Sequence, residues 1–173
     1  MITKNLYSYL LGRGLKQTIV NAITSTDGTL YNHDYYYNNT NDTVFSAMSS
    51  FTNSATSSGV IIGTGTTPAT ASDYKLESQL LSASVKFNGT TSVSYNMDDD
   101  GVSLFSTTNA QNVGTEPIAV SEVGLVGKLF YGSGSSNLCN VLLDRTVLEE
   151  PIVINPGETK QLTYTIRMNY PTV

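Results

Sequence analysis

The feature that most restricts the fold of this chain is an alternation of apolar and polar side chains after residue 59. It is clearest near the C-terminus, where every second position is apolar at Leu162, Tyr164, Ile166 and Met168. Successive side chains of a β-strand point to opposite faces of the sheet, so a period of two indicates a strand with one face in the core. We therefore expect the chain after residue 59 to be built from strands.

The other apolar segments of this region are short and are separated by residues that favour turns. They occupy residues 60–62, 85–87, 93–95, 102–104, 118–129, 141–148 and 152–154. No amphipathic helical pattern lies between them, which argues against a parallel sheet with crossover helices. The spacing predicts about seven or eight short strands, which is typical of an all-β, antiparallel β-sandwich of the jelly-roll or immunoglobulin-like type.

Three polar segments predict where these strands turn. Asn88-Gly89 is a strong hairpin dipeptide, and residues 98–101 read DDDG. Residues 155–158 read NPGE, in which proline fixes φ at the second position and glycine accepts a positive φ at the third. We expect a type II turn at this last segment and strand ends at all three.

The first part of the chain has a different character. Apolar residues recur at every fourth position, at Leu11, Leu15, Ile19 and Ile23, which predicts a helix over residues 14–23. Asp42 or Thr43 can cap a second short helix that has Phe45, Met48 and Phe51 on one face. We therefore expect residues 1–56 to form an N-terminal arm containing short helices that docks on neighbouring subunits, followed by a β-sandwich domain over 57–173.

Composition disfavours several classes of function. Only 13% of the residues are charged, and the net charge is -5, so the chain lacks the basic stripe of a nucleic-acid-binding protein. It also lacks the apolar run of about 18 residues that a membrane span needs, and a secretory signal pattern. Cys139 is the single cysteine, which excludes an intramolecular disulfide and suggests a buried, inert thiol.

The candidate reactive groups do not form a familiar catalytic or metal-binding pattern. The adjacent carboxylates Asp98, Asp99 and Asp100 suggest calcium, but they lack the alternating ligand spacing of a calcium loop, and a solvated hairpin turn is favoured. His33 is the single histidine and lies in a Tyr/Asn-rich stretch, with no G-x-S-x-G elbow elsewhere. We predict no catalytic residues, no metal site, no cofactor and no enzyme activity.

Two groups of residues are candidates for interaction with other molecules. Tyr35, Tyr36 and Tyr37 offer large amphipathic rings suited to protein recognition or to stacking on sugars, or they fold back on the chain's own sandwich. Glu122 and Arg145 lie in apolar strand segments, where an unpaired charge is costly. We expect Glu122 and Arg145 either to pair with each other or to face a neighbouring subunit.

Several segments resemble a family of small proteins encoded in the structural regions of tailed phages and prophages of gut bacteria. The matching motifs are GTGTTP at 63–68, DDDG at 98–101, EVGL at 122–125, LDRTVL at 143–148 and YTIR at 164–167. They occur in the order typical of that family, whereas residues 1–55 match less closely. The resemblance implies a virion-associated structural role after synthesis in the bacterial host cytoplasm, and it brings no catalytic residues.

Together these features predict a structural component of a bacteriophage virion that assembles through protein-protein contacts. A capsid-decorating or head-tail/tail accessory protein is the first expectation, with copies of itself and the major capsid, portal/neck or tail proteins as partners. Homo-oligomerisation is expected because many copies of one chain usually assemble with symmetry. The alternative is a receptor- or glycan-binding module of a phage fibre.

Overall fold

The computed structural model describes residues 1–15, 19–33, 46–54, 57–130 and 138–170. A helix α1 (Lys4–Leu15) is followed by a small hairpin of β1 (Ile19–Thr24) and β2 (Leu30–His33), and by a 3-10 helix η1 (Ser46–Ser49). The remaining strands are β3 (Gly59–Gly63), β4 (Val85–Asp98), β5 (Gly101–Asn112), β6 (Ile118–Phe130), β7 (Leu138–Ile154) and β8 (Thr159–Asn169). No helix of this described part is long and apolar enough to cross a membrane.

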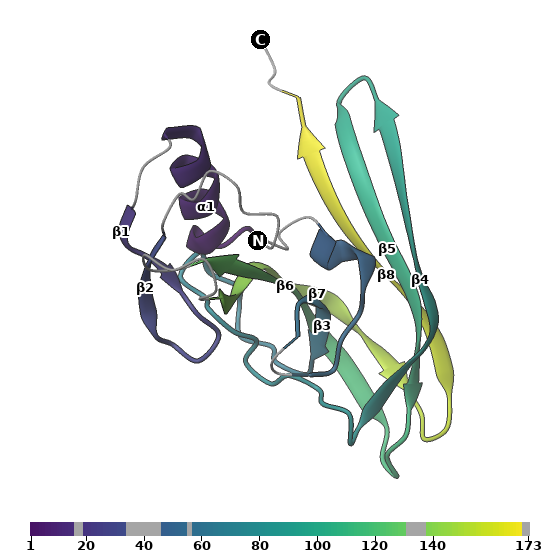
Figure 1. Ribbon diagram of the computed structural model, residues 1–173. Helices are drawn as coiled ribbons and strands as arrows, with labels where there is room; N and C mark the ends of the chain where they lie inside the picture. The colour runs from purple at the N-terminus through teal and green to yellow at the C-terminus, as the bar shows by residue number, and fades with distance from the viewer. Residues whose placement is uncertain (16–18, 34–45, 55–56, 131–137, 171–173) are drawn as a thin grey trace.

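Two three-stranded antiparallel sheets form the body of the molecule. One has the order β3-β6-β7 and the other has the order β4-β5-β8 (Figure 1). The prediction of an all-β, antiparallel sandwich-like fold with a short N-terminal helix is confirmed. The number of strands differs, because the described residues after 59 form six strands, of which β7 alone is 17 residues long.

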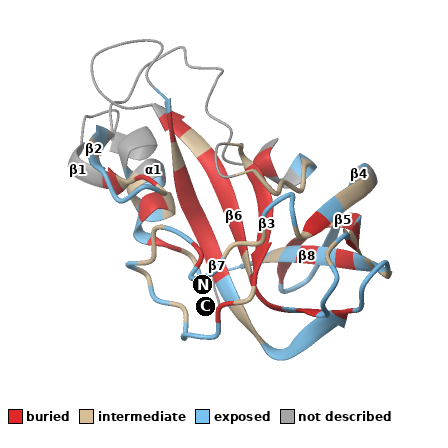
Figure 2. Cartoon of the chain, turned by 90° about the horizontal axis from the view of Figure 1, so that it is seen from below, coloured by how far each residue is buried: buried red, intermediate tan, exposed pale blue. Residues whose placement is uncertain are grey.

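The core lies between these two sheets. One cluster joins Val60, Leu125 and Val141 of the first sheet to Tyr164 of the second. A second cluster contains, from both sheets, Ile62, Val85, Ala110, Ile118, Val120, Ile154 and Leu162. A third, smaller cluster joins Leu76 of the β3-β4 loop to Ile61, Val126 and Leu142 of the first sheet. Figure 2 shows the buried residues concentrated along β3, β6 and β7. Alternating side chains thus fill the space between the sheets, as the period of two predicts.

A buried hydrogen bond also joins the two sheets. The Tyr164 hydroxyl of β8 donates to Asp144 Oδ2 of β7 at 2.7 Å. Burial raises the pKa of Tyr164, and the neighbouring Asp144 carboxylate raises it further, so the phenol stays protonated and remains a donor. A polar tip on an otherwise apolar ring therefore fixes one sheet against the other.

Two of the three predicted turns are present. Asp98 pairs with Gly101 at the end of the β4-β5 hairpin. At 155–158, Gly157 has φ +75° and the Glu158 N–H donates to the carbonyl oxygen of Asn155 at 2.9 Å, as the predicted type II turn requires. This second turn carries the chain from β7 in one sheet to β8 in the other.

The turn predicted at Asn88-Gly89 is absent, because both residues lie inside the 14-residue strand β4. The pairing of β4 with β5 shifts register between Asn88 and Ser92, which marks a bulge. Regular pairing on both sides of the bulge outweighs the local preference for a turn, and the irregularity accommodates the glycine. The dipeptide therefore bends a strand instead of ending it.

The helix predicted over residues 14–23 is also wrong. The structure has a helix over Lys4–Leu15 and then the strand Ile19–Thr24, which pairs with β2. Ile23 belongs to this strand, and its side chain is fully buried in the first core cluster. The β-branched residues 19, 20 and 23 fit a strand better than a helix, and the four-residue spacing that suggested a helix spans both elements.

The described part of residues 1–56 packs on the chain's own sandwich. The Thr3 N–H donates to the carbonyl oxygen of Leu143 at 3.0 Å, so the N-terminus lies along the edge of β7. Ala47 of η1 is buried in the core. Phe51, which follows η1, packs against the first and the second core cluster. Of the three residues predicted to share a helical face, Phe45 lies outside the described residues. The arm is thus continuous with the core of the sandwich.

Candidate functional site

A buried ion pair joins two neighbouring strands of the first sheet. Glu122 lies in β6 and Arg145 in β7, and their side chains are 0% and 4% exposed. The Arg145 Nε donates to Glu122 Oε2 at 2.9 Å. Because a charge buried alone among apolar side chains is strongly destabilising, each of these residues requires the other. Two alternatives were predicted for these residues, pairing with each other or facing a neighbouring subunit, and the structure shows the first.

The loop between β3 and β4 completes this network. Arg145 Nη1 donates to Asp73 Oδ2 at 2.8 Å, and its Nη2 donates to the carbonyl oxygen of Thr67 at 3.1 Å. The Glu122 carboxylate accepts three backbone N–H groups from the same loop, those of Gly65, Glu77 and Ser78. We call Glu122, Arg145 and Asp73 the buried charge network. It holds the β3-β4 loop against β6 and β7 through hydrogen bonds and ion pairs, and its role is structural.

The pKa values in this network follow from its hydrogen bonds. Burial by itself would raise the pKa of Asp73, but hydrogen bonds from Thr70 and Arg145 outweigh burial and hold it below its usual value. Burial would likewise lower the pKa of Arg145, and its bonds to Asp73 and Glu122 raise it instead. The ion pair between Arg145 and Asp73 is therefore maintained at neutral pH.

The tip of the β4-β5 hairpin is organised by Asp98. Its Oδ1 accepts the backbone N–H groups of Asp100 and Gly101, each at 3.0 Å. Arg167 of β8 binds both carboxylate oxygens, with distances of 2.8 Å and 2.9 Å. Within the ranges that the structure describes, no group of three His, Cys, Asp or Glu side chains is placed to hold a metal ion. The DDDG segment is the hairpin turn favoured by its spacing.

This arrangement predicts a strongly acidic Asp98. The hydrogen bond from Arg167 is the largest cause that lowers its pKa, from 3.8 to about 2. Because the folded pKa lies below the unfolded value, the stabilisation is present above pH 3.8 and is lost as the pH falls to about 2. Carboxyl-carbon NMR should give a midpoint near 2 in the wild type and a higher one in Arg167→Met. A wild-type midpoint near 3.8 would contradict the bidentate contact.

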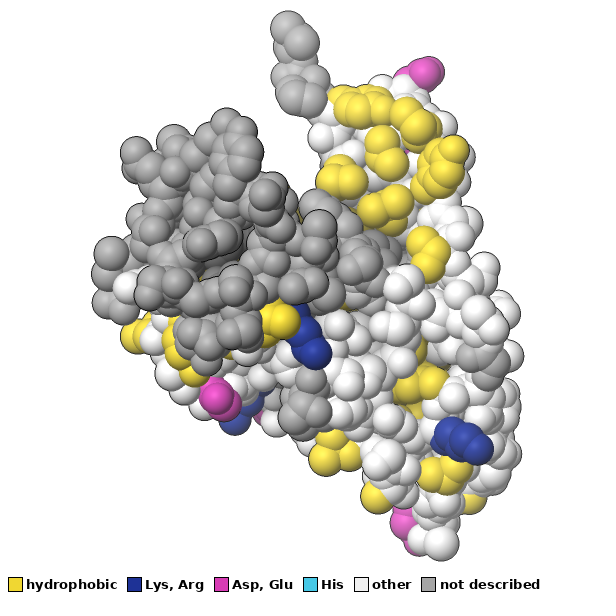
Figure 3. All heavy atoms as spheres, in the orientation of Figure 1, with side chains coloured by type: hydrophobic (Ala, Val, Ile, Leu, Met, Phe, Trp, Pro, Cys, Tyr) yellow, Lys and Arg dark blue, Asp and Glu magenta, His cyan; other side chains and the backbone are white. Residues whose placement is uncertain are grey.

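An exposed apolar surface covers the hairpin end of the β4-β5-β8 sheet. Cross-strand pairing forms the rows Met97–Val102–Met168 and Tyr95–Leu104–Ile166. We call these six residues together with Val93 the apolar end face. Tyr95 is 72% exposed, Met97 62%, Val93 49% and Met168 45%. Val102, Leu104 and Ile166 are half-buried, and Leu104 and Ile166 pack against the first core cluster. Figure 3 shows apolar side chains gathered at this end of the sheet.

The apolar end face is the outward continuation of the sandwich core. Along β8, Leu162 and Tyr164 are each 5% exposed, whereas Met168 on the same side of the strand is 45% exposed. The hairpin end projects beyond the other sheet (Figure 1), so the described residues of that sheet do not cover it. The opposite side of these strands is mainly polar, with Ser94, Asn96, Ser103, Thr165 and Arg167. Met168 was expected to lie in the core with the other apolar residues of β8. It lies on the same side of the strand as they do, but it is exposed to solvent, so that expectation is wrong.

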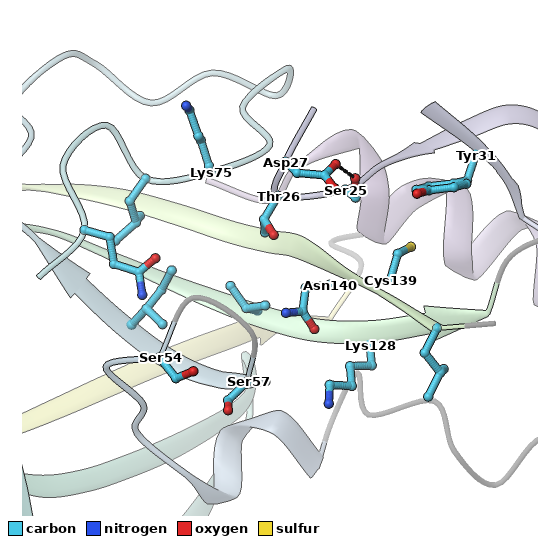
Figure 4. Close-up of a pocket in the computed structure, with 15 residues that line it drawn as sticks. Ser25, Thr26, Asp27, Tyr31, Ser54, Ser57, Lys75, Lys128, Cys139 and Asn140 are labelled. Atoms are coloured by element: carbon cyan, nitrogen blue, oxygen red, sulfur yellow. Dashed lines mark hydrogen bonds between the residues drawn. The ribbon is translucent and has the colours of Figure 1, made fainter. Parts of the chain in front are cut away.

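A polar cavity of about 650 Å³ lies between the β1-β2 turn, the residues that precede β3, and strands β6 and β7. Hydroxyl, amide and charged side chains line it (Figure 4), among them Ser25, Thr26, Asp27, Ser57, Lys75, Gln79, Lys128 and Asn140. Asp27 accepts hydrogen bonds from the Ser25 hydroxyl and the Thr29 N–H. Gln79 Nε2 is buried without a hydrogen-bond partner among the described residues. Apolar side chains of Ile61, Leu76, Val126 and Leu138 complete the lining, so the cavity suits a small ligand with both polar and apolar parts.

The predicted site residues are distributed as follows. Glu122 and Arg145 meet in the buried charge network, and Cys139 is buried in the core as expected. His33 lies at the end of β2, paired through its backbone with Ile19, and Tyr35–Tyr37 lie outside the described residues. Sequence reasoning missed the apolar end face, because the alternation of 93, 95 and 97 reads the same whether a face is covered or exposed.

Two features thus remain as candidates for contact with other molecules, the apolar end face and the polar cavity. The end face is formed entirely by paired strands, whereas the cavity borders segments outside the described residues. The buried charge network serves to fix the β3-β4 loop. Comparisons with models of protein families, with curated proteins and with solved structures find no match to this chain.

Proposed function

We propose that this chain is a structural component of a bacteriophage virion that assembles through protein-protein contacts, as a capsid-decorating or head-tail/tail accessory protein. The apolar end face is the observation that carries this proposal. Contiguous exposed apolar surfaces on proteins in water mark sites of interaction, because covering them removes apolar area from water. The proposed role is non-enzymatic and requires no cofactor.

The chemistry of the end face is that of an interface core. Its seven side chains are uncharged and include one tyrosine and two methionines, residue types that are enriched where protein interfaces exclude water. Given the exposed fractions above, they present on the order of 500 Å² to solvent, against about 800 Å² per partner in a standard interface. The face is therefore large enough to form most of one interface.

The resemblance to tailed-phage structural proteins supports the location of the proposed assembly. Two of the resembling motifs lie in the part of the chain that forms the end face, DDDG at 98–101 in the β4-β5 turn and YTIR at 164–167 in β8. We propose that the protein is made in the host cytoplasm and is incorporated into particles, where major capsid, portal/neck or tail chains surround it. The end face would then be covered in the assembled virion.

The test compares two variants of the chain in particles of the phage that encodes it. Tyr95→Ser with Met97→Ser removes apolar area from the end face, and Ser94→Ala with Asn96→Ala changes the opposite side of the same strand. We expect quantitative mass spectrometry of purified particles to show at least a tenfold loss of the first variant and wild-type levels of the second. All four residues are exposed, so circular dichroism should show the same fold for both.

Absence of the wild-type chain from purified particles, or full incorporation of the end-face variant, would overturn the proposal. A receptor- or glycan-binding module is the second candidate, and the polar cavity with its buried, unpartnered Gln79 amide favours it. The two roles differ in the same experiment. A binding module would keep the end-face variant in particles, and its contact with host cells would depend on residues of the cavity or on Tyr35–Tyr37.

A further inference from the structure

We infer that the apolar end face packs against the same face of a second copy of this chain, to form a twofold symmetric sheet-on-sheet dimer. The inference rests on the proposed function and names the partner of that surface. The shape of the surface and its lack of charged residues favour a second copy over an unrelated chain.

The shape of the end face is that of one half of a sandwich. Its rows Met97–Val102–Met168 and Tyr95–Leu104–Ile166 continue the side of the β4-β5-β8 sheet that packs on β3-β6-β7 deeper in the molecule. A sheet face of this kind is complementary to another sheet at a spacing of about 10 Å. A second copy presents such a sheet with matching length, twist and side chains.

The charge distribution allows two identical chains to meet at this surface. The chain carries a net charge of -5, so most of its surface repels a second copy. The end face has no charged residue, and the nearest ion pair, Asp98 with Arg167, is neutralised by its two short hydrogen bonds. Self-association therefore brings no charged residue of the end face itself into contact.

The acidic hairpin tip selects the orientation of the two copies. Asp99 and Asp100 follow the end face directly at the β4-β5 turn. A twofold axis parallel to the strands would bring the two tips together, and like charges in proximity are destabilising. An axis perpendicular to the strands places the tips at opposite ends and brings the middle rows, with Leu104 on the central strand, close to the axis.

The area indicates a reversible dimer. Each end face presents on the order of 500 Å², so a dimer would bury about 1,000 Å² of accessible surface in total. This area lies below the roughly 1,200 to 2,000 Å² that stable interfaces bury. The contact is then weak in dilute solution and is strengthened at the high local concentration of an assembly. Symmetric dimers of this isologous type are the commonest oligomers.

Sedimentation equilibrium of the purified wild-type chain over a range of concentrations tests the inference. We expect a concentration-dependent dimer, and at least tenfold weaker dimerisation for Tyr95→Ser with Met97→Ser than for the control Ser94→Ala with Asn96→Ala. Tyr95→Cys, in the exposed part of the middle row, should cross-link to itself with a short bismaleimide. Asp99→Cys at the tip and Thr165→Cys on the opposite side of the sheet should not, and the native Cys139 is buried.

The outcomes separate this inference from the proposed function. The chain could remain a monomer at every concentration while the end-face variant is lost from particles. That result would exclude a second copy as the partner, and it would leave the virion role with a different chain bound to the end face. A dimer that cross-links through Asp99→Cys but not through Tyr95→Cys would overturn the antiparallel arrangement. Normal incorporation of the end-face variant would contradict the virion role whether or not the chain dimerises.

Discussion

Replacement of Arg145 by methionine is expected to lower the free energy of unfolding by about 3 to 5 kcal/mol. Methionine fills a similar volume but leaves the fully buried Glu122 carboxylate without its cation. It also removes the hydrogen bonds to Asp73 and Thr67 that hold the β3-β4 loop. Urea denaturation of the purified variant, followed by circular dichroism, measures the change.

The matched control for this variant is Arg167→Met. Arg167 also binds an aspartate through two hydrogen bonds, but its side chain is 38% exposed and that of Asp98 is 41% exposed. Water solvates both groups after the substitution, so the unfolding midpoint should fall much less than in Arg145→Met. Equal losses in the two variants would mean that burial does not determine the strength of these contacts, which would contradict the account of the buried charge network.

The Gly63→Ala substitution is expected to destabilise the chain by about 3 kcal/mol, because overpacking a closely packed site forces its neighbours apart. A Cβ at Gly63 would lie 2.5 Å from both Glu122 Oε1 and the Ser78 carbonyl oxygen. Neither atom has freedom to move, since Glu122 is held by four hydrogen bonds and Ser78 belongs to the loop backbone. The unfolding midpoint in urea measures this loss.

Gly157→Ala provides the comparison for this second prediction. Gly157 has φ +75°, and no atom would lie within 4 Å of an added Cβ. Its replacement should therefore cost only the backbone strain of the left-handed conformation, about 1 kcal/mol. A larger loss at Gly157 than at Gly63 would show that backbone conformation, and not close approach, makes the glycines of this chain necessary.

The glycines of the GTG motif have a physical explanation in this network. The backbone at Gly63 and Gly65 approaches the Glu122 carboxylate so closely that a Cβ at either position would fall within 2.6 Å of Oε1. The Gly65 N–H also donates to this same oxygen at 3.1 Å. The GTG, EVGL and LDRTVL segments of the sequence thus meet at one place in space. Together they hold the β3-β4 loop against the β3-β6-β7 sheet.

Local features of the sequence determined the strands and two of their turns. The alternation in β8, the DDDG hairpin and the NPGE turn depend on side-chain period and on the φ preferences of neighbouring residues, which act within a few positions. The cost of burying an isolated charge limited Glu122 and Arg145 to pairing with each other or facing a neighbouring subunit. These predictions needed no knowledge of which strands lie side by side.

The tertiary structure decided the features that depend on distant neighbours. Pairing with β5 turned Asn88-Gly89 into a bulge, and pairing of β1 with β2 made a strand of residues predicted as helix. Tyr164 and Met168 share one side of one strand, yet only Tyr164 is covered. The alternation specifies which side is apolar, but the extent of the opposing sheet determines where that side meets water, because burial is set by contacts between segments far apart in the chain.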